Sequence, residues 1–161
     1  MHTIPQPILE VFRQVYARLQ PTDINWVLTG SLAFAMQGVG LTPRDIDLQT
    51  DRQGAYRIEA LFAGHVTRPV TDSDAAERVR SHYGDLLIEG VLVQIMGDMQ
   101  KRESLAHEWE APTDLNAYKR WIEFEHMLVS VLSLEYEAEA YRKMGRLERA
   151  ELLAKYAKIG G

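Results

Sequence analysis

The stretch WVLTGSLAFAMQGVGLTPRDIDLQT, residues 26–50, contains the most informative pattern in this chain. It starts in an apolar, β-branched and aromatic run, which predicts a short buried strand ending at Gly30. Ser31 then begins a short helical segment that Gly38 ends, and a loop rich in glycine and proline follows. From Asp45, polar and apolar residues alternate with a period of two, which predicts a second strand. The order is therefore strand, Gly-Ser, helix, loop, strand.

Asp45 and Asp47 occupy alternate positions of the second strand, so we expect their side chains to point to the same face. Two carboxylates held side by side repel each other unless a cation lies between them, and Mg²⁺ suits such oxygen ligands. Gly30 and Ser31 begin a helix, whose free N–H groups and positive end attract phosphate. A metal site beside a phosphate site is typical of phosphoryl or nucleotidyl transfer. Each feature alone also fits a structural role, as a solvated strand face or a helix cap.

Together the two features resemble the signature of the nucleotidyltransferase superfamily that includes DNA polymerase β. Gly30-Ser31 is followed after thirteen residues by Asp45-Ile46-Asp47-Leu48, as in the minimal nucleotidyltransferases and the antibiotic nucleotidyltransferases. The resemblance covers most of residues 26–155. Over this range the chain is similar to a group of small bacterial and archaeal members of the superfamily. It runs through GVGLTPRDIDLQTD (38–51), VRSHYG (79–84), VLVQIMGDMQ (91–100) and LSLEYEAEAYRKMGRLERAELL (132–153).

This resemblance implies a fold of the α/β or α+β class, the nucleotidyltransferase fold, with a short mixed sheet flanked by helices. Residues 133–158 are expected to form a C-terminal helical hairpin within a single domain spanning 1–161. The implied activity is Mg²⁺-dependent transfer of a nucleoside monophosphate from a nucleoside triphosphate to a hydroxyl of an acceptor. The acceptor is a small molecule, a protein or an RNA end. Asp45 and Asp47 are implied to be catalytic metal ligands, and Gly30 and Ser31 to bind the nucleotide.

The superfamily carries a third carboxylate on a later strand, and the matching position here is Gln94. A glutamine oxygen coordinates Mg²⁺ without supplying charge, which weakens metal binding and removes the usual base. Glu89 and Asp98 lie nearby in the sequence, although neither is expected on the right face. The alternative hypothesis is therefore a catalytically degraded nucleotide-binding or interaction module of the same fold.

Two basic residues on a strand-like run are candidate nucleotide ligands. Arg80 and His82 alternate along RVRSHYG and are expected to share a face, where they would bind a phosphate or the acceptor. The alternative is an edge strand with polar positions turned outward.

The C-terminal tail offers two further candidates. Lys143 and Arg146 flank a break at Gly145 and are hypothesised to reach the triphosphate. The alternative is a solvated pair of helices in which acidic and basic residues alternate, Glu137 among them. In that interpretation Glu139 and Lys143 form an i,i+4 ion pair.

Composition bounds these hypotheses. The chain has 161 residues, of which 46% are hydrophobic, and this length favours one domain with its own core. With 18 Lys+Arg against 23 Asp+Glu the net charge is -5, which excludes a strongly basic nucleic-acid wrapper. The absence of cysteine excludes disulfide frameworks, thiolate metal sites and cysteine nucleophiles. Because no signal peptide or membrane-spanning run is found, we expect a soluble, cytoplasmic protein without a membrane partner, with oligomerisation possible.

Outside the central stretch, helical periodicity in PILEVFRQVYARL predicts an amphipathic helix with Ile8, Leu9, Phe12, Val15, Tyr16 and Leu19 on its apolar side. The other predicted elements are a helix at 53–63, a strand near 66–71, strands in RVRSHYG, DLLIEG and VLVQIM, a tight hairpin at Glu89-Gly90, loop with some helix over 97–116, strand or helix in WIEFEHMLVSVL, and helices over 133–158.

Overall fold

The computed structural model describes residues 4–73 and 78–160, and both expected domain boundaries, 1 and 161, lie outside this part of the chain. None of the helices in the described part is long and apolar enough to span a bilayer. The helices are α1 (Gln6–Leu19), α2 (Gly30–Met36), α3 (Arg52–Leu61), α4 (Leu115–Tyr118), α5 (Leu134–Lys143) and α6 (Leu147–Gly160), with a 3₁₀ turn, η1 (Ala63–His65). The strands are β1 (Trp26–Thr29), β2 (Ile46–Thr50), β3 (Val66–Ser73), β4 (Val79–Ile88), β5 (Val91–Lys101), β6 (Lys119–Phe124) and β7 (Met127–Leu132).

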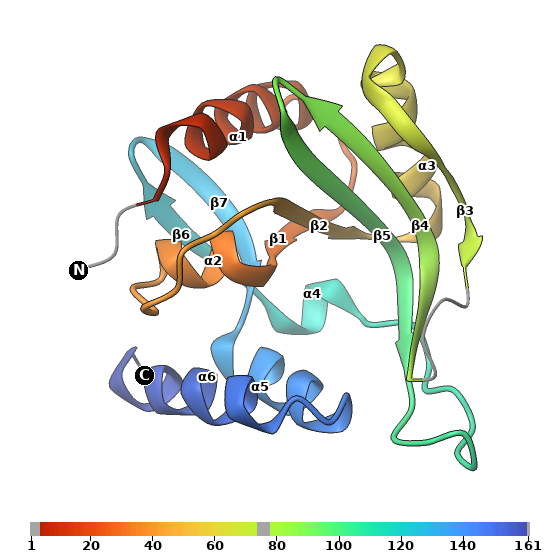
Figure 1. Cartoon of the computed structure of the whole chain (residues 1–161), viewed down its shortest axis with the longest axis vertical. Coiled ribbons are helices and arrows are strands. Elements are labelled where there is room, and N and C mark those ends of the chain that lie inside the picture. Colours follow the sequence, from red (N-terminus) through yellow and green to blue (C-terminus); the bar gives the residue numbers. More distant parts are fainter. Residues whose placement is uncertain (1–3, 74–77, 161) are drawn as a thin grey trace.

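The strands of the described residues form one seven-stranded sheet in the order β3-β4-β5-β2-β1-β7-β6 (Figure 1). β2 runs antiparallel to β1 and parallel to β5, and β1 runs parallel to β7. The remaining neighbours are antiparallel. The predicted mixed sheet flanked by helices is thereby confirmed, and the strand that carries Asp47 lies at its centre.

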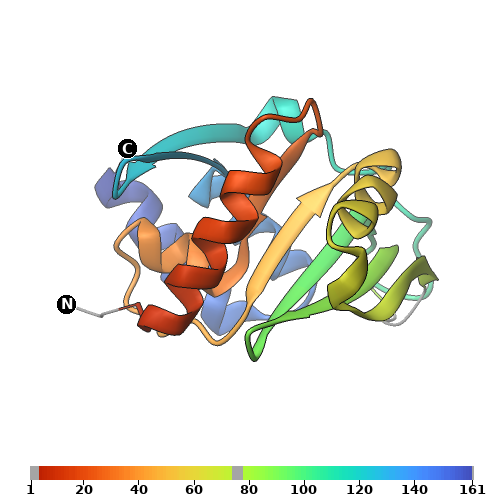
Figure 2. The ribbon, with the colours of Figure 1, turned by 90° about the horizontal axis from the view of Figure 1, so that it is seen from above.

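Helices cover both faces of this sheet (Figures 1 and 2). On one face, Phe12 of α1 packs against Trp26 of β1, with ring centroids 6.5 Å apart. On the opposite face, Thr29 of β1 donates a hydrogen bond to Glu137 of α5. Trp26 and Thr29 are three residues apart on one strand, so they point to opposite faces. The hairpin of α5 and α6 therefore covers the face to which Thr29 points.

The apolar side of α1 is close to the prediction. Tyr16 is only half-buried, and its hydroxyl accepts a hydrogen bond from the backbone N–H of Leu128. The helix begins with a proline near its first position, which suits the fixed φ of that residue. Its buried residues are Ile8, Leu9, Val11, Phe12, Val15 and Leu19.

β4 differs from the prediction, because two expected strands are one. The sequence predicted a break at Gly84, yet β4 continues through it from Val79 to Ile88. A Cβ atom at this position would lie 2.9 Å from the backbone oxygen of Arg68 on the neighbouring strand β3. The glycine therefore permits close approach of β3 rather than ending the strand. The tight hairpin at Glu89-Gly90 is confirmed, with positive φ at both residues.

The two ambiguous segments are also resolved. β5 extends to Lys101, so the first part of 97–116 is strand, and the single turn of α4 begins at Leu115. The segment that read as strand or helix is the antiparallel pair β6 and β7. Its turn is formed by Glu125 and His126, both with positive φ.

Candidate active site

Asp45 and Asp47 lie at the start of the central strand β2. Asp47 is paired in register with Thr29 on β1 and with Gln94 on β5, and Asp45 lies in the bend directly before β2. The two carboxyl groups are close enough that the charge of Asp45 raises the pKa of Asp47. The structure therefore brings the two predicted aspartates together.

Gly30 lies against Asp47. A Cβ atom built on Gly30 would be 2.1 Å from Oδ2 of Asp47, and the residue has a φ of 73°. Both features require glycine here, because an L side chain would be strained and would collide with the carboxylate. From the sequence, Gly30 was expected to begin a phosphate-binding helix. In the structure this glycine makes room for the carboxylate of Asp47.

The start of α2 also differs from the prediction. Ser31 was expected to cap the helix, but the helix begins at Gly30, and Thr29 is its N-cap residue. The hydroxyl of Thr29 makes no capping hydrogen bond and instead donates to the Glu137 carboxylate. Ser31 is therefore the second residue of α2, where its side chain is half-exposed.

The Asp47 carboxylate has the electrostatic character of a cation ligand. Burial, together with the charges of Asp45 and Glu137, raises the pKa of Asp47 to about 7. Burial also raises the pKa of Asp45. Within the described residues, Oδ1 of Asp47 is buried and has no hydrogen-bond partner. A buried acceptor without a donor is costly, and a bound divalent cation would satisfy it. These two aspartates therefore fit a hard divalent cation such as Mg²⁺.

Gln94 occupies the position beside Asp47 on the next strand. It is paired in register with Asp47 on one side and with Asp85 of β4 on the other, so the three side chains share a face. The Gln94 amide donates a hydrogen bond to the hydroxyl of Tyr83. Burial and the Asp85 carboxylate raise the pKa of Tyr83 above its usual range. Gln94 is thus held in place by Tyr83 beside the candidate metal ligands.

Acidic residues near Gln94 in the sequence were weighed as substitutes for the third carboxylate. Glu89 lies in the exposed turn between β4 and β5 and accepts a hydrogen bond from Gln14, remote from Asp47. Asp85 was missed, although it follows Tyr83 with the strand period of two that identifies a shared face. Its Oδ1 atom is buried without a hydrogen-bond partner among the described residues.

Glu137 is a second carboxyl group that the sequence did not identify as part of the site. Only 3% of the residue is exposed, although the sequence placed it on a solvated helix surface. Burial raises the pKa of Glu137 to about 7, while the hydrogen bond from Thr29 and the charge of Lys101 oppose this shift. The signal was available: Glu137 lies three and four residues before Ala140 and Tyr141, on the apolar side of α5.

Lys101 is the buried cation of this region. The residue is 4% exposed, and its Nζ atom donates hydrogen bonds to the hydroxyls of Thr113, at 2.9 Å, and Tyr136, at 2.8 Å. A buried ammonium group is rare unless it is paired or takes part in function. The burial of Lys101 could not be predicted from the sequence, because α5 and the loop after β5 approach it only in the folded chain.

A cavity of about 230 Å³ joins these groups between the sheet and α5. The groups that line it carry both signs of charge and include Gly30, Asp47, Gln94, Lys101, Glu137 and Arg146. The described residues contain no group of three or more His, Asp or Glu side chains arranged to hold a metal ion. A cation at this site would therefore depend on Asp45, Asp47 and neutral oxygen ligands.

The predicted tail residues divide into two cases. Arg146 lines the cavity, and its guanidinium lies 4.8 Å from the centre of the Tyr141 ring. Lys143 instead forms an ion pair with Glu110 at 2.8 Å and lines a neighbouring cavity. The expected ion pair between Glu139 and Lys143 is not formed, because Glu139 receives two hydrogen bonds from Arg142.

Arg80 and His82 are not brought to this cavity. His82 pairs in register with Gly97, and its ring contacts Tyr56 of α3, on the other face of the sheet. Arg80 donates a hydrogen bond to Gln100 at 2.9 Å. The residues of β4 on the face of Asp47 are those in odd positions near its middle, such as Tyr83. The predicted role of Arg80 and His82 in nucleotide binding therefore has no support from their positions.

The family model described as aminoglycoside-2″-adenylyltransferase matches residues 11–158. The chain belongs to this family. It is also 49% identical to a candidate nucleotidyltransferase from Thermotoga maritima, whose crystal structure matches with a TM-score of 0.84 over 98% of this chain and 96% of that chain. These findings confirm the resemblance to the minimal nucleotidyltransferases. No curated protein matches the sequence significantly.

More distant members of the fold are antibiotic-modifying enzymes. The lincosamide antibiotic adenylyltransferase LnuA, bound to lincomycin, matches with a TM-score of 0.54 and 11% identity over 93% of this chain and 98% of that chain. The solution structure of the antibiotic-resistance factor ANT(2″)-Ia matches with a TM-score of 0.60 and 13% identity over 96% of this chain and 89% of that chain. At these identities the similarity concerns the fold.

Proposed function

We propose that this protein transfers a nucleoside monophosphate group from a nucleoside triphosphate to a hydroxyl group of an acceptor molecule. The observation that carries this proposal is the Asp47 carboxylate, which lies against Gly30 beside Asp45 and whose buried Oδ1 atom has no hydrogen-bond donor among the described residues. Such an arrangement is costly in a protein without a cation and suits one that binds a cation with its substrate.

Asp45 and Asp47 would hold the divalent cation, with the oxygen of Gln94 available as a neutral ligand. Mg²⁺ is the candidate because it prefers oxygen ligands and is usually bound through one or two carboxylates and substrate phosphates. When bound, such an ion supplies charge stabilisation to the phosphates in the transition state. Gly30 and Ser31 at the start of α2 are the candidate contacts of the triphosphate, as the family signature implies.

The chemical step exchanges one bond to the α-phosphorus for another. The acceptor hydroxyl oxygen forms a bond to the α-phosphorus, and the bond from that phosphorus to the bridging oxygen breaks. Pyrophosphate leaves with the electron pair. Lys101 and Arg146 line the cavity and would offset the negative charge of the leaving group. Glu137, the other carboxyl group besides Asp47 among the described cavity residues, is the candidate acceptor of the hydroxyl proton.

The family suggests which substrates to test first. Because the matching family model describes an adenylyltransferase, ATP is the first candidate donor and AMP the candidate group transferred. A structure of ANT(2″)-Ia, matched at 14% identity, contains adenylyl-2″-tobramycin, and LnuA was solved with lincomycin. Aminoglycosides and lincosamides are therefore the first acceptors to screen, followed by other hydroxyl compounds, proteins and RNA ends.

The test begins with calorimetric titration of ATP, GTP, CTP and UTP, each with Mg²⁺ and with a chelator, into the wild-type protein and Asp47→Asn. We expect Mg²⁺-dependent binding of one nucleotide that the variant loses. Pyrophosphate release with the acceptor panel then measures transfer. Wild-type protein that binds none of the four nucleotides in Mg²⁺ would contradict the proposal.

Gln94 favours a second candidate function, a nucleotide-binding module without transferase activity. A site with two carboxylates has less negative charge for a cation than the three found in the superfamily. This alternative predicts that the wild-type protein binds nucleotide but releases no pyrophosphate with any acceptor. Pyrophosphate release would then appear only in the Gln94→Glu variant. Release by the wild-type protein, lost in Asp47→Asn, would exclude it.

A further inference from the structure

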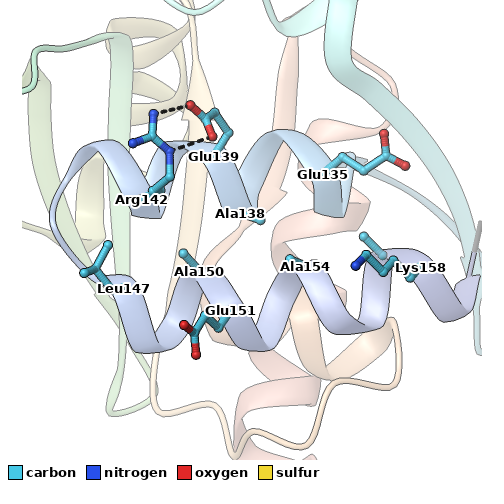
Figure 3. A pocket seen from close by; sticks show the side chains of 10 residues that line it. Glu135, Ala138, Glu139, Arg142, Leu147, Ala150, Glu151, Ala154 and Lys158 are labelled. Carbon is cyan, nitrogen blue, oxygen red and sulfur yellow. Dashed lines mark hydrogen bonds and ion pairs between the residues drawn. The ribbon is translucent and has the colours of Figure 1, made fainter.

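The outer side of the α5–α6 hairpin, turned away from the sheet, carries an uncovered groove (Figure 3). The groove has a volume of about 570 Å³, and α5 and α6 contribute all the described residues that line it. Its floor is formed by Ala138 of α5 and by Ala150 and Ala154 of α6. At one end, Leu147, which is 59% exposed, extends the apolar lining of the groove.

Charged side chains of both signs surround this apolar floor. Figure 3 shows Arg142 and Leu147 at one end of the groove, Glu135 and Lys158 at the other, and Glu151 between them. Among the described residues, Glu135, Glu151 and Lys158 have no ion-pair partner. The rim therefore offers acids and a base that form no ion pair with the part of the chain that the structure describes.

We propose that this groove binds a second copy of the same chain, to form a two-fold symmetric dimer. The two-fold axis would run along the groove, so that α5 of one copy lies on α6 of the other and the two hairpins form a four-helix bundle. In this arrangement Glu135 faces the partner's Lys158, and Arg142 faces the partner's Glu151. Each pair occurs twice because the interface is symmetric.

Charge complementarity identifies a second copy as the occupant. A two-fold interface requires one surface to complement itself, and this rim places an acid and a base on different helices at the same end. The other symmetric arrangement, with the axis across the groove, would place α5 on the partner's α5 and leave Lys158 opposite the partner's Leu147. The alanine floor suits close contact, because small side chains permit short distances between helix axes.

The proposed dimer does not depend on the proposed activity. The groove lies on the outer side of α5, whereas Glu137 and Tyr141 on its inner side face the cavity near Asp47. Oligomeric state is measured without nucleotide or acceptor, so a monomeric protein would leave the proposed transfer reaction untouched. Conversely, a protein without transferase activity would still test this interface.

The experiment is sedimentation equilibrium of the full chain over a range of concentrations. We expect a dimer for the wild type and a monomer for Ala154→Glu, which places two carboxylates in the apolar floor of the symmetric contact. The matched control is Ala117→Glu, the same substitution on an exposed helical position of α4 outside the groove, which should stay dimeric. Circular dichroism melting of both variants checks that they fold.

Charge exchange tests the arrangement itself. Glu135→Lys and Lys158→Glu each replace two attractive pairs by repulsive ones and should raise the dimer dissociation constant by about tenfold. The double variant restores opposite charges and should return the constant to near that of the wild type. A monomeric wild type at all concentrations, a dimer unaffected by Ala154→Glu, or a double variant no tighter than the single ones would each overturn the proposal.

Discussion

Gly30 and Asp47 lie so close together that no side chain fits between them. A Cβ atom on residue 30 would be 2.1 Å from Oδ2 of Asp47, far inside van der Waals contact. The glycine of the Gly-Ser motif and the second aspartate of the Asp-x-Asp motif are therefore two sides of one contact. Their joint occurrence has a steric reason in addition to the chemistry of phosphate and metal.

The first prediction concerns this contact. Gly30→Ala should lower the free energy of unfolding by at least about 2 kcal/mol, because it adds a clash to the strain of a positive φ. It should also abolish Mg²⁺-dependent nucleotide binding by displacing Asp47. Gly38→Ala is the matched control, since Gly38 also has a positive φ but no atom within 4 Å of an added Cβ. Chemical denaturation and calorimetry measure both effects; equal losses in the two variants would show that the Asp47 contact is unimportant.

The second prediction concerns pH and metal. The pKa values of Asp47 and Glu137 are both about 7 in the folded chain, above the usual 3.8 and 4.5. The folded state holds these protons more tightly than the unfolded state, so without divalent cations their contribution to stability decreases as pH rises from about 4 to about 7. Mg²⁺ needs ionised carboxylates, so it should raise Tm more at about pH 8 than at about pH 5.

Thermal unfolding with Mg²⁺ and with chelator provides this measurement. Asp47→Asn removes one ionisable ligand and should reduce the Mg²⁺-induced rise at the higher pH. If Mg²⁺ raises the Tm of the wild type equally at both pH values, the metal binds elsewhere. The same conclusion follows if Mg²⁺ raises the Tm of Asp47→Asn as much as that of the wild type.

The third prediction concerns Glu137. Glu137→Gln keeps an oxygen that accepts the hydrogen bond from Thr29 but removes a buried charge, so it should raise the unfolding free energy above neutral pH by about 1 kcal/mol or more. Its rate of pyrophosphate release should fall at saturating ATP, while ATP affinity changes little. Glu148→Gln, at an exposed position of α6 that lines neither the groove nor the cavity near Asp47, controls for the loss of an acid from the helical hairpin. A variant with the wild-type rate would remove Glu137 from the chemical step.

The fourth prediction concerns the third ligand position. Gln94→Glu places a carboxylate in register with Asp47 and Asp85. It should tighten Mg²⁺ binding by about tenfold, because ligand charge sets the affinity of such sites. The same variant should be less stable than the wild type in chelator, where the added charge is uncompensated. Unchanged Mg²⁺ affinity would mean that this side chain does not reach the cation.

The fifth prediction concerns Lys101. Lys101→Met should weaken ATP binding by about tenfold, because it removes the buried cation from the cavity. The fold should tolerate the change, since the hydroxyls of Thr113 and Tyr136 are 3.0 Å apart and still bond to each other. Lys155→Met, on an exposed position of α6 outside the cavity, is the matched control. Loss of binding in both variants alike would point to a general charge effect.

The local pattern was sufficient for most of the helices and strands. The alternation of polar and apolar residues around Asp45 and Asp47 predicted that their side chains lie close together, because side chains two residues apart on a strand point to one face. The periodicity of α1 and the turn at Glu89-Gly90 were also predicted correctly. Gly84 misled the prediction, since a glycine that permits close strand approach looks in sequence like one that ends a strand.

What the sequence by itself determined was the fold family, the aspartate pair and the glycine beside it, all of which depend on residues close together in the chain. Only the tertiary structure decided which distant residues complete the site. Glu137 and Lys101 reach the cavity because α5 folds back onto the face of β2, and His82 is excluded because its pairing with Gly97 turns it toward α3. Burial is the physical reason: the same charged side chain is solvated or functional according to what packs over it, and that partner is remote in sequence.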